Sequence, residues 1–147
     1  NLNSVCKDCI NELKSSFITK GIFPKLVVTE ELVVFSDTKW LRFVLYQLLT
    51  NALKYSNEGG KIVICAENRG DFAVLHIQDE GCGIDPRDIR RIYDLFFTGQ
   101  NGRQRGESSG LGLYMVKQIL DYLGHTIEVQ SELGKGSTFT IYFSNPK

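Results

Sequence analysis

A wide apolar stripe between residues 37 and 57 constrains the fold most strongly. Its members recur every three or four positions, as in a helix that buries one face. Asp37 stands where an N-cap is expected, and the segment 57–60, rich in Asn and Gly, ends the helix in a turn. A helix of this kind needs a second layer to cover it. The stripe comprises Trp40, Leu41, Val44, Leu45, Leu48, Leu49, Ala52 and Leu53.

Short apolar segments elsewhere predict strands, and three more periodic segments predict helices. Because strands outnumber helices without strict alternation, we expect an α+β two-layer sandwich, with helices on one face of a mixed, mostly antiparallel sheet, over a doubly wound parallel sheet. The predicted strands are Leu26–Val28 paired with Leu32–Phe35, a hairpin of 61–67 and 72–78, and a final pair of 126–130 and 138–143. The further helices run from Leu2 to near Gly21, from Asp85 and Pro86 with Ile89, Ile92 and Leu95 inward, and from Leu111 to Tyr122.

Size and charge narrow the class of protein. The 147 residues suit one domain, taken as 1–147, and the 17 basic and 17 acidic side chains cancel, so any phosphate binding must be local. We therefore expect no nucleic-acid partner. No apolar run approaches the roughly 18 residues of a membrane span, so the piece is expected to be soluble. Cys6 and Cys9 have metal-site spacing, but no second pair of ligands follows, which favours four reduced thiols.

One edge of the long helix is polar. Gln47, Asn51, Lys54 and Tyr55 are spaced by four, three and one residues and so share that edge. Asn51 offers a neutral oxygen suited to Mg²⁺, and Lys54 adds a point charge. Taken alone, the edge is better explained as a solvated helix face.

Two glycine-rich segments are the other candidate sites. Asp79 begins Asp-x-Gly-x-Gly at a strand end, where a carboxylate can accept a hydrogen bond from an adenine amino group, although a capped turn explains the pentapeptide alone. Segment 108–113 enters a helix, where unpaired amides favour phosphate. Between them, 98–109 has no apolar period, so we expect a mobile loop, which is unusual unless functional.

Taken in their order along the chain, these polar and glycine-rich segments resemble those of the GHKL superfamily of ATPases. Gyrase, heat-shock chaperones, mismatch-repair proteins and histidine kinases share this superfamily. The resemblance covers nearly the whole chain and implies the ATP-binding catalytic domain of a bacterial sensor histidine kinase, with a Bergerat-type fold and an ATP lid at 98–109. The similar segments are 49–56 (N box), 79–83 (G1 box), 93–97 (F box), 110–113 (G2 box) and 134–139 (last glycine box).

The resemblance also implies roles for individual residues. Asn51 would ligate Mg²⁺, Asp79 would hold the adenine amino group, and Asn51 and Lys54 would be the catalytic residues. Lys54 and two arginines of the loop would face the phosphates, and Tyr55 would pack beside the nucleotide. The ATP-binding residues expected on this basis are Gln47, Asn51, Lys54, Tyr55, Asp79, Gly81, Gly83, Ile84, Phe97, Arg103, Arg105, Ser109, Gly110, Leu111, Gly112, Leu113 and Thr138.

The residue at position 47, a glutamine, indicates whether the γ-phosphate is passed to water. Hydrolysing members of the superfamily carry a glutamate one turn before the Asn, and an uncharged amide cannot act as a base for water at neutral pH. Transfer of the γ-phosphate to a histidine in trans or upstream is therefore expected. His76 lies within a predicted strand and His125 at a helix end, so neither fits as the acceptor.

A narrower similarity is to the kinases that pair with peptide-antibiotic transporters in Gram-positive bacteria. It rests on Lys39-Trp40, Gln47 and 97–103, while Ser108 stands where many members have glycine. It implies a cytoplasmic domain of a cell-membrane protein, with Asn1 to Cys9 similar to the segment that follows the acceptor helices. The implied partners are its own dimerisation and phosphoacceptor helices in a homodimer, a response regulator, and a transporter reached through a membrane region.

Two other functions share these motifs. One is a nucleotide-binding regulatory module without transfer activity, favoured by Ser108 and by the missing acceptor. The other is a serine kinase of the anti-sigma-factor type, whose phosphoprotein would be stable to acid and labile to base. A transfer assay separates all three.

Overall fold

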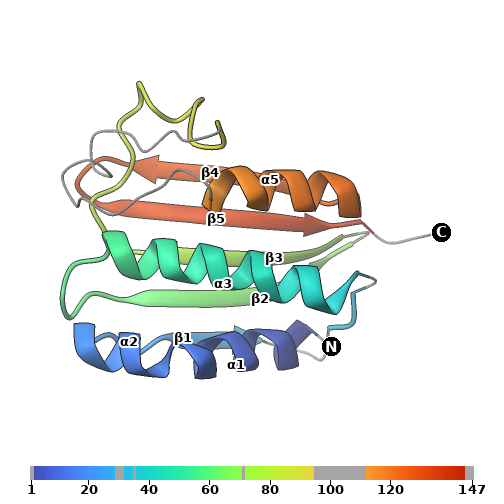
Figure 1. Cartoon of the computed structure of the whole chain (residues 1–147), viewed down its shortest axis with the longest axis horizontal. Helices are drawn as coiled ribbons and strands as arrows, with labels where there is room; N and C mark the ends of the chain where they lie inside the picture. The colour runs from blue at the N-terminus through green and yellow to red at the C-terminus, as the bar shows by residue number, and fades with distance from the viewer. Residues whose placement is uncertain (1, 29–31, 35, 71, 95–111, 145–147) are drawn as a thin grey trace.

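The computed structural model describes residues 2–28, 32–34, 36–70, 72–94 and 112–144. Its five-stranded sheet has the order β1-β2-β3-β5-β4, and the helices lie on one face of it (Figure 1). β1 pairs with β2 in parallel and every other pair is antiparallel. The predicted α+β sandwich is thus confirmed. The strands are β1 Lys25–Val28, β2 Ile62–Arg69, β3 Phe72–Asp79, β4 Thr126–Glu132 and β5 Gly136–Phe143.

The long helix α3, Thr38–Tyr55, lies at the centre of the helical layer. Oδ1 of Asp37 accepts the Trp40 amide at 3.1 Å, which is the expected N-cap. The predicted stripe packs inward, except that Trp40 is 39% exposed. Contacts of α3 with α1, β3 and α5 make it the element around which the core forms. The sequence pattern that most restricted the fold therefore supplies its centre.

The N-terminal helix is divided in two. α1 covers Leu2–Glu12 and α2 covers Lys14–Lys20, with Leu13 between them at φ −98°, ψ 10°. Gly21 closes α2 in the left-handed conformation at φ 68°, as the predicted end requires. On the other side of α3 lies α5, Gly112–Leu123. It corresponds to the helix predicted from Leu111 to Tyr122, of which Gly112 is the first described residue.

Alternation along the strands separates the two faces of the sheet. Leu75 and Ile141 are register partners on β3 and β5, and both are fully buried against the helices. Asp79 lies four residues after Leu75 and so faces the same side. The odd-numbered positions of β3 and β5 therefore face the helices, and the even-numbered ones face away.

The predicted pairing of Leu26–Val28 with Leu32–Phe35 is wrong. β1 pairs instead with β2, matching Leu26 to Ile64, and residues 32–34 form no strand. Leu32 is buried, and its carbonyl oxygen accepts the Leu2 amide at 2.9 Å, so this segment packs over the start of α1. Phe35 lies outside the described residues.

The helix predicted from Asp85 and Pro86 is also not formed within the described residues. Residues 86–93 are a succession of turns, in which the Asp88 and Arg91 amides each bond to the carbonyl oxygen three residues earlier at 2.8 Å. Asp85 begins these turns rather than a helix, and its carboxylate accepts the Arg87 amide at 2.9 Å. The same side chain pairs with the Arg87 guanidinium, which lowers the pKa of Asp85 to about 2. Ile92 is buried as expected, Ile89 is half-buried, and Leu95 lies outside the description.

The cysteines are free thiols, as predicted. Burial raises the pKa of Cys6 to about 12 and that of Cys9 to about 11, which keeps both protonated at neutral pH. They therefore act as small apolar side chains in the core. In the part of the chain that is described, no helix is long and apolar enough to cross a bilayer.

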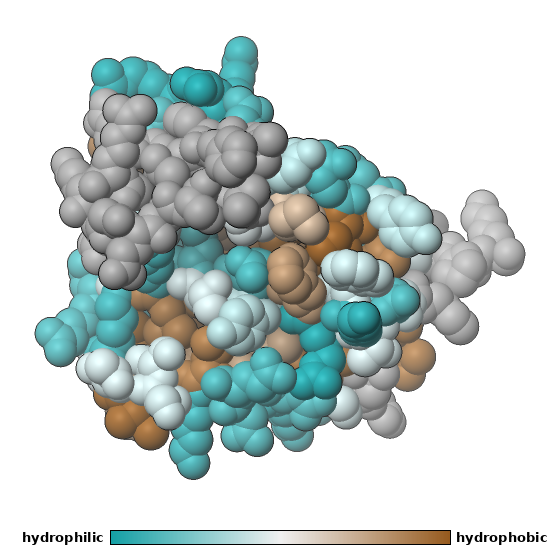
Figure 2. Space-filling model, viewed as in Figure 1, coloured by the Kyte–Doolittle hydropathy of each residue, from teal (hydrophilic) through white to brown (hydrophobic). Residues whose placement is uncertain are grey.

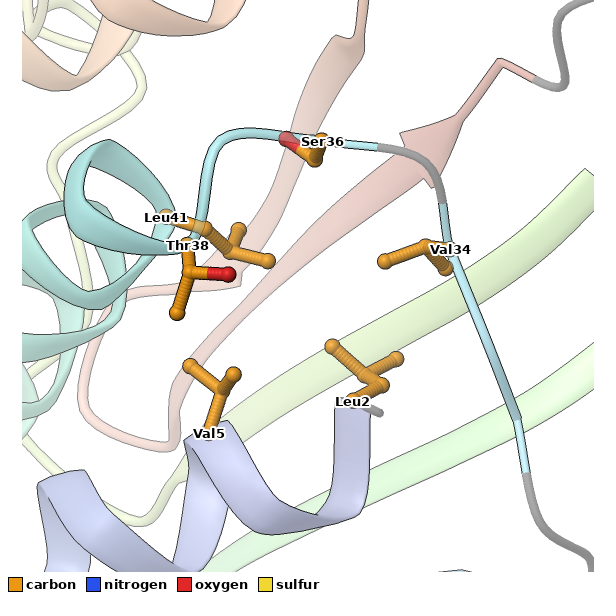
Figure 3. Close-up of a pocket in the computed structure, with 6 residues that line it drawn as sticks. All are labelled: Leu2, Val5, Val34, Ser36, Thr38 and Leu41. Atoms are coloured by element: carbon orange, nitrogen blue, oxygen red, sulfur yellow. The ribbon is translucent and has the colours of Figure 1, made fainter.

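The outer surface of the helical layer is mixed. Hydrophobic residues emerge on this side in several separate patches between hydrophilic ones (Figure 2). A small pocket lies between the start of α1, the segment before α3 and the first turn of α3, where Leu2, Val5, Val34, Ser36, Thr38 and Leu41 surround it (Figure 3). Its volume of about 20 Å³ has room for a water molecule but not for a nucleotide.

Candidate functional site

Several element ends meet at the end of the molecule opposite that pocket. β3 and α3 both run toward this end, and β5 begins there (Figure 1). Ser56, the C-cap of α3, forms a β-bridge with Gly81, and the Cys82 amide donates to the Tyr55 carbonyl oxygen at 3.2 Å. The segment that follows Asp79 is therefore fastened to the end of the helix that carries Asn51, Lys54 and Tyr55.

Asp79 is the buried charged group of this region. It ends β3, between Ile62 of β2 and Ser137 of β5, and is only 6% exposed. Its Oδ1 accepts the Gly81 amide at 2.9 Å. Burial raises its pKa, while backbone hydrogen bonds from Gly81 and Ser137 act in the opposite direction. A carboxylate held in this way is a fixed acceptor for one further donor, such as an amino group.

The glycines of the region make room for the protein's own backbone. A β-carbon at Gly81 would lie 2.4 Å from the Tyr55 carbonyl oxygen, and one at Gly83 would lie 2.3 Å from that of Glu132. Gly83 also has φ +73°, and a β-carbon at Gly136 would lie 2.1 Å from the Asp79 carbonyl oxygen. Gly81 and Gly83 are two of the ATP-binding residues predicted from the sequence, and Gly136 was not among them. In the structure they let three backbone segments close around Asp79.

The polar edge of α3 is formed as predicted. Gln47, Asn51, Lys54 and Tyr55 are all half-buried, and the Lys54 ammonium lies 5.6 Å from the centre of the Tyr55 ring. The Gln47 side chain also packs on α5, because a β-carbon at Gly112 would lie 2.8 Å from its Oε1. Gln47 thus joins the polar edge to the start of α5.

The donor set of this edge fits magnesium bound with a nucleotide. In the described ranges, no group of three His, Cys, Asp or Glu side chains could hold a metal by itself. Asn51 supplies one half-buried amide oxygen, and Mg²⁺ keeps most of its waters when phosphates complete its coordination. Asn51 would hold the ion there, with Lys54 one turn further along α3.

Thr138 is not brought to the site. It pairs with Gln78 and Gln130, and it lies on the sheet face away from the helices, since its neighbour Phe139 is buried in the core. The residue beside Asp79 is Ser137, which the sequence argument missed. Ser137 is its register partner and is 8% exposed. Side chains alternate between the two faces along β5, so a buried Phe139 places Ser137 on the same face. This alternation would have identified Ser137 from the sequence.

Ser137 belongs to a small hydrogen-bond network. Its Oγ lies 2.8 Å from Oγ of Ser131, which in turn accepts the Ile84 amide at 2.7 Å. The Gly134 amide donates to the Cys82 carbonyl oxygen at 2.8 Å. These contacts join the turn between β4 and β5 to the segment after Asp79. Ile84, one of the predicted site residues, is held by its backbone in this network.

The two histidines have other partners. His76 is even-numbered on β3 and faces away from the helices, where Nδ1 lies 2.9 Å from Oγ1 of Thr140. His125 is buried with Nε2 3.0 Å from Oγ of Ser36, and Nδ1 accepts the Ser144 amide at 3.2 Å. Ser144 follows the far end of β5 from Asp79. Both rings are therefore turned away from Asp79.

Part of the predicted site lies outside the described residues. This applies to the loop 98–109 and to Phe97, Arg103, Arg105, Ser109, Gly110 and Leu111. Leu113 is described and packs half-buried on the core from α5. Tyr93, at the edge of the described part, has a buried hydroxyl with no hydrogen-bond partner there.

A family comparison agrees with this arrangement. Residues 36–147 match the model of the histidine kinase-, DNA gyrase B- and HSP90-like ATPases. The chain belongs to this ATPase family. The match includes α3, the buried Asp79 and the β4–β5 pair, so the site described above lies within the family domain.

Curated relatives of this ATPase domain are sensor kinases. The chain is 38% identical over 148 residues to the sensor histidine kinase YxdK of Bacillus subtilis, covering 97% of this chain and 44% of the relative. It is 43% identical over 135 residues to the sensor protein BceS of the same species, covering 91% of this chain and 40% of the relative. The chain thus spans less than half the length of these relatives.

A solved structure has the same fold. The nucleotide-free catalytic domain of the histidine kinase ThkA superposes with a TM-score of 0.85 at 23% identity, covering 99% of this chain and 93% of that one. ThkA has also been solved in complex with the response regulator protein TrrA, where the TM-score is 0.82 at 22% identity over 99% of this chain and 41% of ThkA. The similarity in fold to the ThkA catalytic domain thus covers 99% of this chain.

Proposed function

We propose that this ATPase-family domain binds Mg-ATP and transfers the γ-phosphate to a histidine on the dimerisation domain of a two-component sensor kinase. The observation that carries the proposal is the buried Asp79 carboxylate, fastened through Gly81 to the end of α3. Family membership and the similarity to YxdK and BceS support the same reading.

Asp79 would recognise the adenine. Its 6% exposure and its fixed hydrogen bond to Gly81 leave little freedom to reorient, so a ligand has to present a donor to it. The adenine amino group is such a donor, whereas the carbonyl oxygen of guanine at that position would face a carboxylate. Ser137 replaces Thr138 in this proposal, because it is the hydroxyl residue in register with Asp79.

The polar edge of α3 would hold the triphosphate. Asn51 would ligate Mg²⁺, which when bound supplies charge neutralisation at the phosphates. Lys54 would add a positive charge, and Tyr55, whose ring lies 5.6 Å from the Lys54 ammonium, would pack by the nucleotide. The loop 98–109 would be the ATP lid, with Phe97, Arg103, Arg105, Ser109, Gly110, Leu111, Gly112 and Leu113 contributing around the phosphates.

The phosphate would pass to an imidazole. Gln47 is an amide at the position where a base for water is required, and it is engaged by the first turn of α5. In the transfer, the bond between the γ-phosphorus and the bridging oxygen of ADP breaks. A phosphorus–nitrogen bond forms at the acceptor histidine, and the ring releases its proton. The acceptor is proposed to belong to dimerisation helices outside this chain.

The remaining partners follow from the relatives. YxdK and BceS are named as sensor proteins, and ThkA is known in complex with a response regulator protein. We extend this to a homodimeric membrane sensor kinase, whose domain described here lies in the cytoplasm. It would pass its phosphate to a response regulator, with a peptide-antibiotic transporter as partner of the membrane region.

A transfer assay tests the proposal. The domain is mixed with its own dimerisation helices and γ-labelled ATP with Mg²⁺, and an acid-labile, base-stable phosphoprotein is expected. No labelled helices at saturating nucleotide, with ATP binding intact, would instead indicate a regulatory module. A label that is stable to acid and lost in base would indicate a serine kinase.

A further inference from the structure

Lys20, the last residue of α2, reaches across to the end of α3. Its Nζ donates to the carbonyl oxygens of Ser56 at 2.8 Å and Lys54 at 3.2 Å, and also to that of Leu53. These acceptors lie 33, 34 and 36 residues further along the chain. The Lys20 carbonyl oxygen in turn accepts the Gly59 amide at 3.0 Å.

This contact supplies what a helix C-terminus lacks. The last four carbonyl groups of a helix have no partner within it, and they carry the negative end of the helix dipole. A half-buried ammonium group that donates to three carbonyl oxygens answers both needs at once. Ser56 caps the end locally through Oγ, which bonds the Ala52 carbonyl oxygen at 2.5 Å. Lys20 adds hydrogen bonds from α2 to the same helix end.

We propose that Lys20 is a positioning residue for the nucleotide site, an inference that rests on the proposed function. Lys20 holds the carbonyl of Ser56, Ser56 forms the β-bridge with Gly81, and the Gly81 amide holds Oδ1 of Asp79. Two further acceptors, Leu53 and Lys54, lie in the last turn of α3 with Tyr55. Lys20 therefore fixes the polar edge of α3 relative to the Asp79 carboxylate.

Lys20 differs from an ordinary helix cap in what its acceptors are joined to. The contacts of Lys20 end at a stretch where α3 and the segment after β3 are joined, by the Ser56–Gly81 bridge and by the hydrogen bond from the Cys82 amide to the Tyr55 carbonyl oxygen. Loss of the ammonium group frees this junction first. The His125 amide, which donates to the Leu120 carbonyl oxygen at 2.9 Å, lies at the other end of the molecule and serves as the reference.

Lys20→Met tests the inference, since it removes the ammonium group and keeps an unbranched apolar stem. Calorimetry at a temperature where the variant is folded is expected to show affinities for Mg-ATP and Mg-ADP lowered about tenfold, the value of one hydrogen bond to a charged group. Hydrogen exchange is expected to quicken at the amides of Gly59, Gly81 and Cys82, and not at His125. Lys14→Met is the matched control, because Lys14 is exposed at the start of the same helix.

Specific outcomes overturn the inference or separate it from the proposed function. Unchanged affinity in Lys20→Met overturns it, and so does faster exchange spread equally over the Gly81 and His125 amides, which marks global destabilisation only. A wild-type domain that does not bind Mg-ATP overturns the proposed function instead. If Lys20→Met does not fold, Lys20→Arg carries the same measurements. Its planar fork spreads the donors and cannot place a single donor atom where the three carbonyl oxygens converge on Nζ, so a loss of affinity of about threefold is expected and wild-type affinity overturns the inference.

Discussion

Oδ1 of Asp79 accepts the backbone amide of Gly81 at 2.9 Å, and the side chain is buried on the helix-facing side of the sheet. Burial raises the pKa of this carboxyl group. The charge therefore lowers the stability of the folded state at neutral pH, a cost that the proposed recognition of an amino donor would explain. The conflict between stability and binding at this one residue can be measured.

Asp79→Asn is expected to weaken binding of Mg-ATP about 10- to 100-fold, because a hydrogen bond to a charged group contributes about 1.5–3 kcal/mol. Titration calorimetry at pH 7.5 checks this. Asp8→Asn, an exposed change on α1, serves as control and should bind like the wild type. Unchanged affinity in Asp79→Asn would remove Asp79 from the adenine role.

Asp79→Asn is expected to weaken binding but to raise the free energy of unfolding, by an amount that depends on pH. The folded-state pKa of Asp79 is raised, so the wild type loses stability from this group as pH rises from the unfolded value of about 3.8 through the folded one. Asparagine has no such loss. The free energy of unfolding of Asp79→Asn, relative to wild type, should therefore increase between pH 4 and pH 7 in urea titrations. A difference that stays constant with pH would contradict the burial argument.

Gly83 should tolerate no side chain. Its φ is +73° and a β-carbon would lie 2.3 Å from the Glu132 carbonyl oxygen, so Gly83→Ala is expected to lower the free energy of unfolding by more than about 2 kcal/mol. Gly70→Ala is the matched control, with φ +63° and nothing within 4 Å of its β-carbon, and should cost about 1 kcal/mol. Urea unfolding of both variants measures these two losses. Equal decreases in the free energy of unfolding would show that the backbone conformation alone, and not the close contact, matters at Gly83.

Local patterns predicted the elements well, and the partners of the strands less well. Asp37 as an N-cap and the helix end at Gly21 could be predicted because each signal acts within four residues. The pairing of Leu26–Val28 could not, because a short apolar strand carries no mark of its partner, and β1 pairs with a strand that begins more than thirty residues later. Pro86 signalled a helix start but not whether a regular helix would follow.

For the candidate site, the sequence pointed to segments rather than to every residue. The segment after Asp79 is joined to the end of α3, the helix that carries the polar edge, while Thr138 lies one residue from the hydroxyl in register with Asp79. A shift of one residue on a strand changes the face, and only the burial of Phe139 fixes that parity. Lys20 could not have been found, because its role depends on acceptors more than thirty residues away.

His125 should make the fold sensitive to mild acid. Burial lowers its pKa from 6.5, so the unfolded chain takes up the proton first and stability is lost as pH falls from about 6.5 through the folded value. One proton limits the slope to about 1.4 kcal/mol per pH unit. Urea titrations of wild type and His125→Asn between pH 5 and 7.5 should show the larger loss in the wild type. An NMR titration that finds the ring protonating at or above pH 6.5 would refute this.

Gln47→Glu should redirect the phosphate to water. The side chain is half-buried on the polar edge of α3, one turn before Asn51, and a carboxylate there can take a proton from an attacking water where the amide cannot. The carboxylate would also lie at the N-terminal end of α5, beside Gly112, where the helix dipole favours negative charge. Because a positioned base contributes about 10²–10⁴-fold, we expect release of phosphate from ATP without acceptor helices to rise at least about tenfold. Gln47→Met keeps the length of the side chain without a base and should release phosphate no faster than the wild type. If Gln47→Glu binds Mg-ATP and still shows the wild-type release rate, the amide at position 47 is not what withholds the phosphate from water.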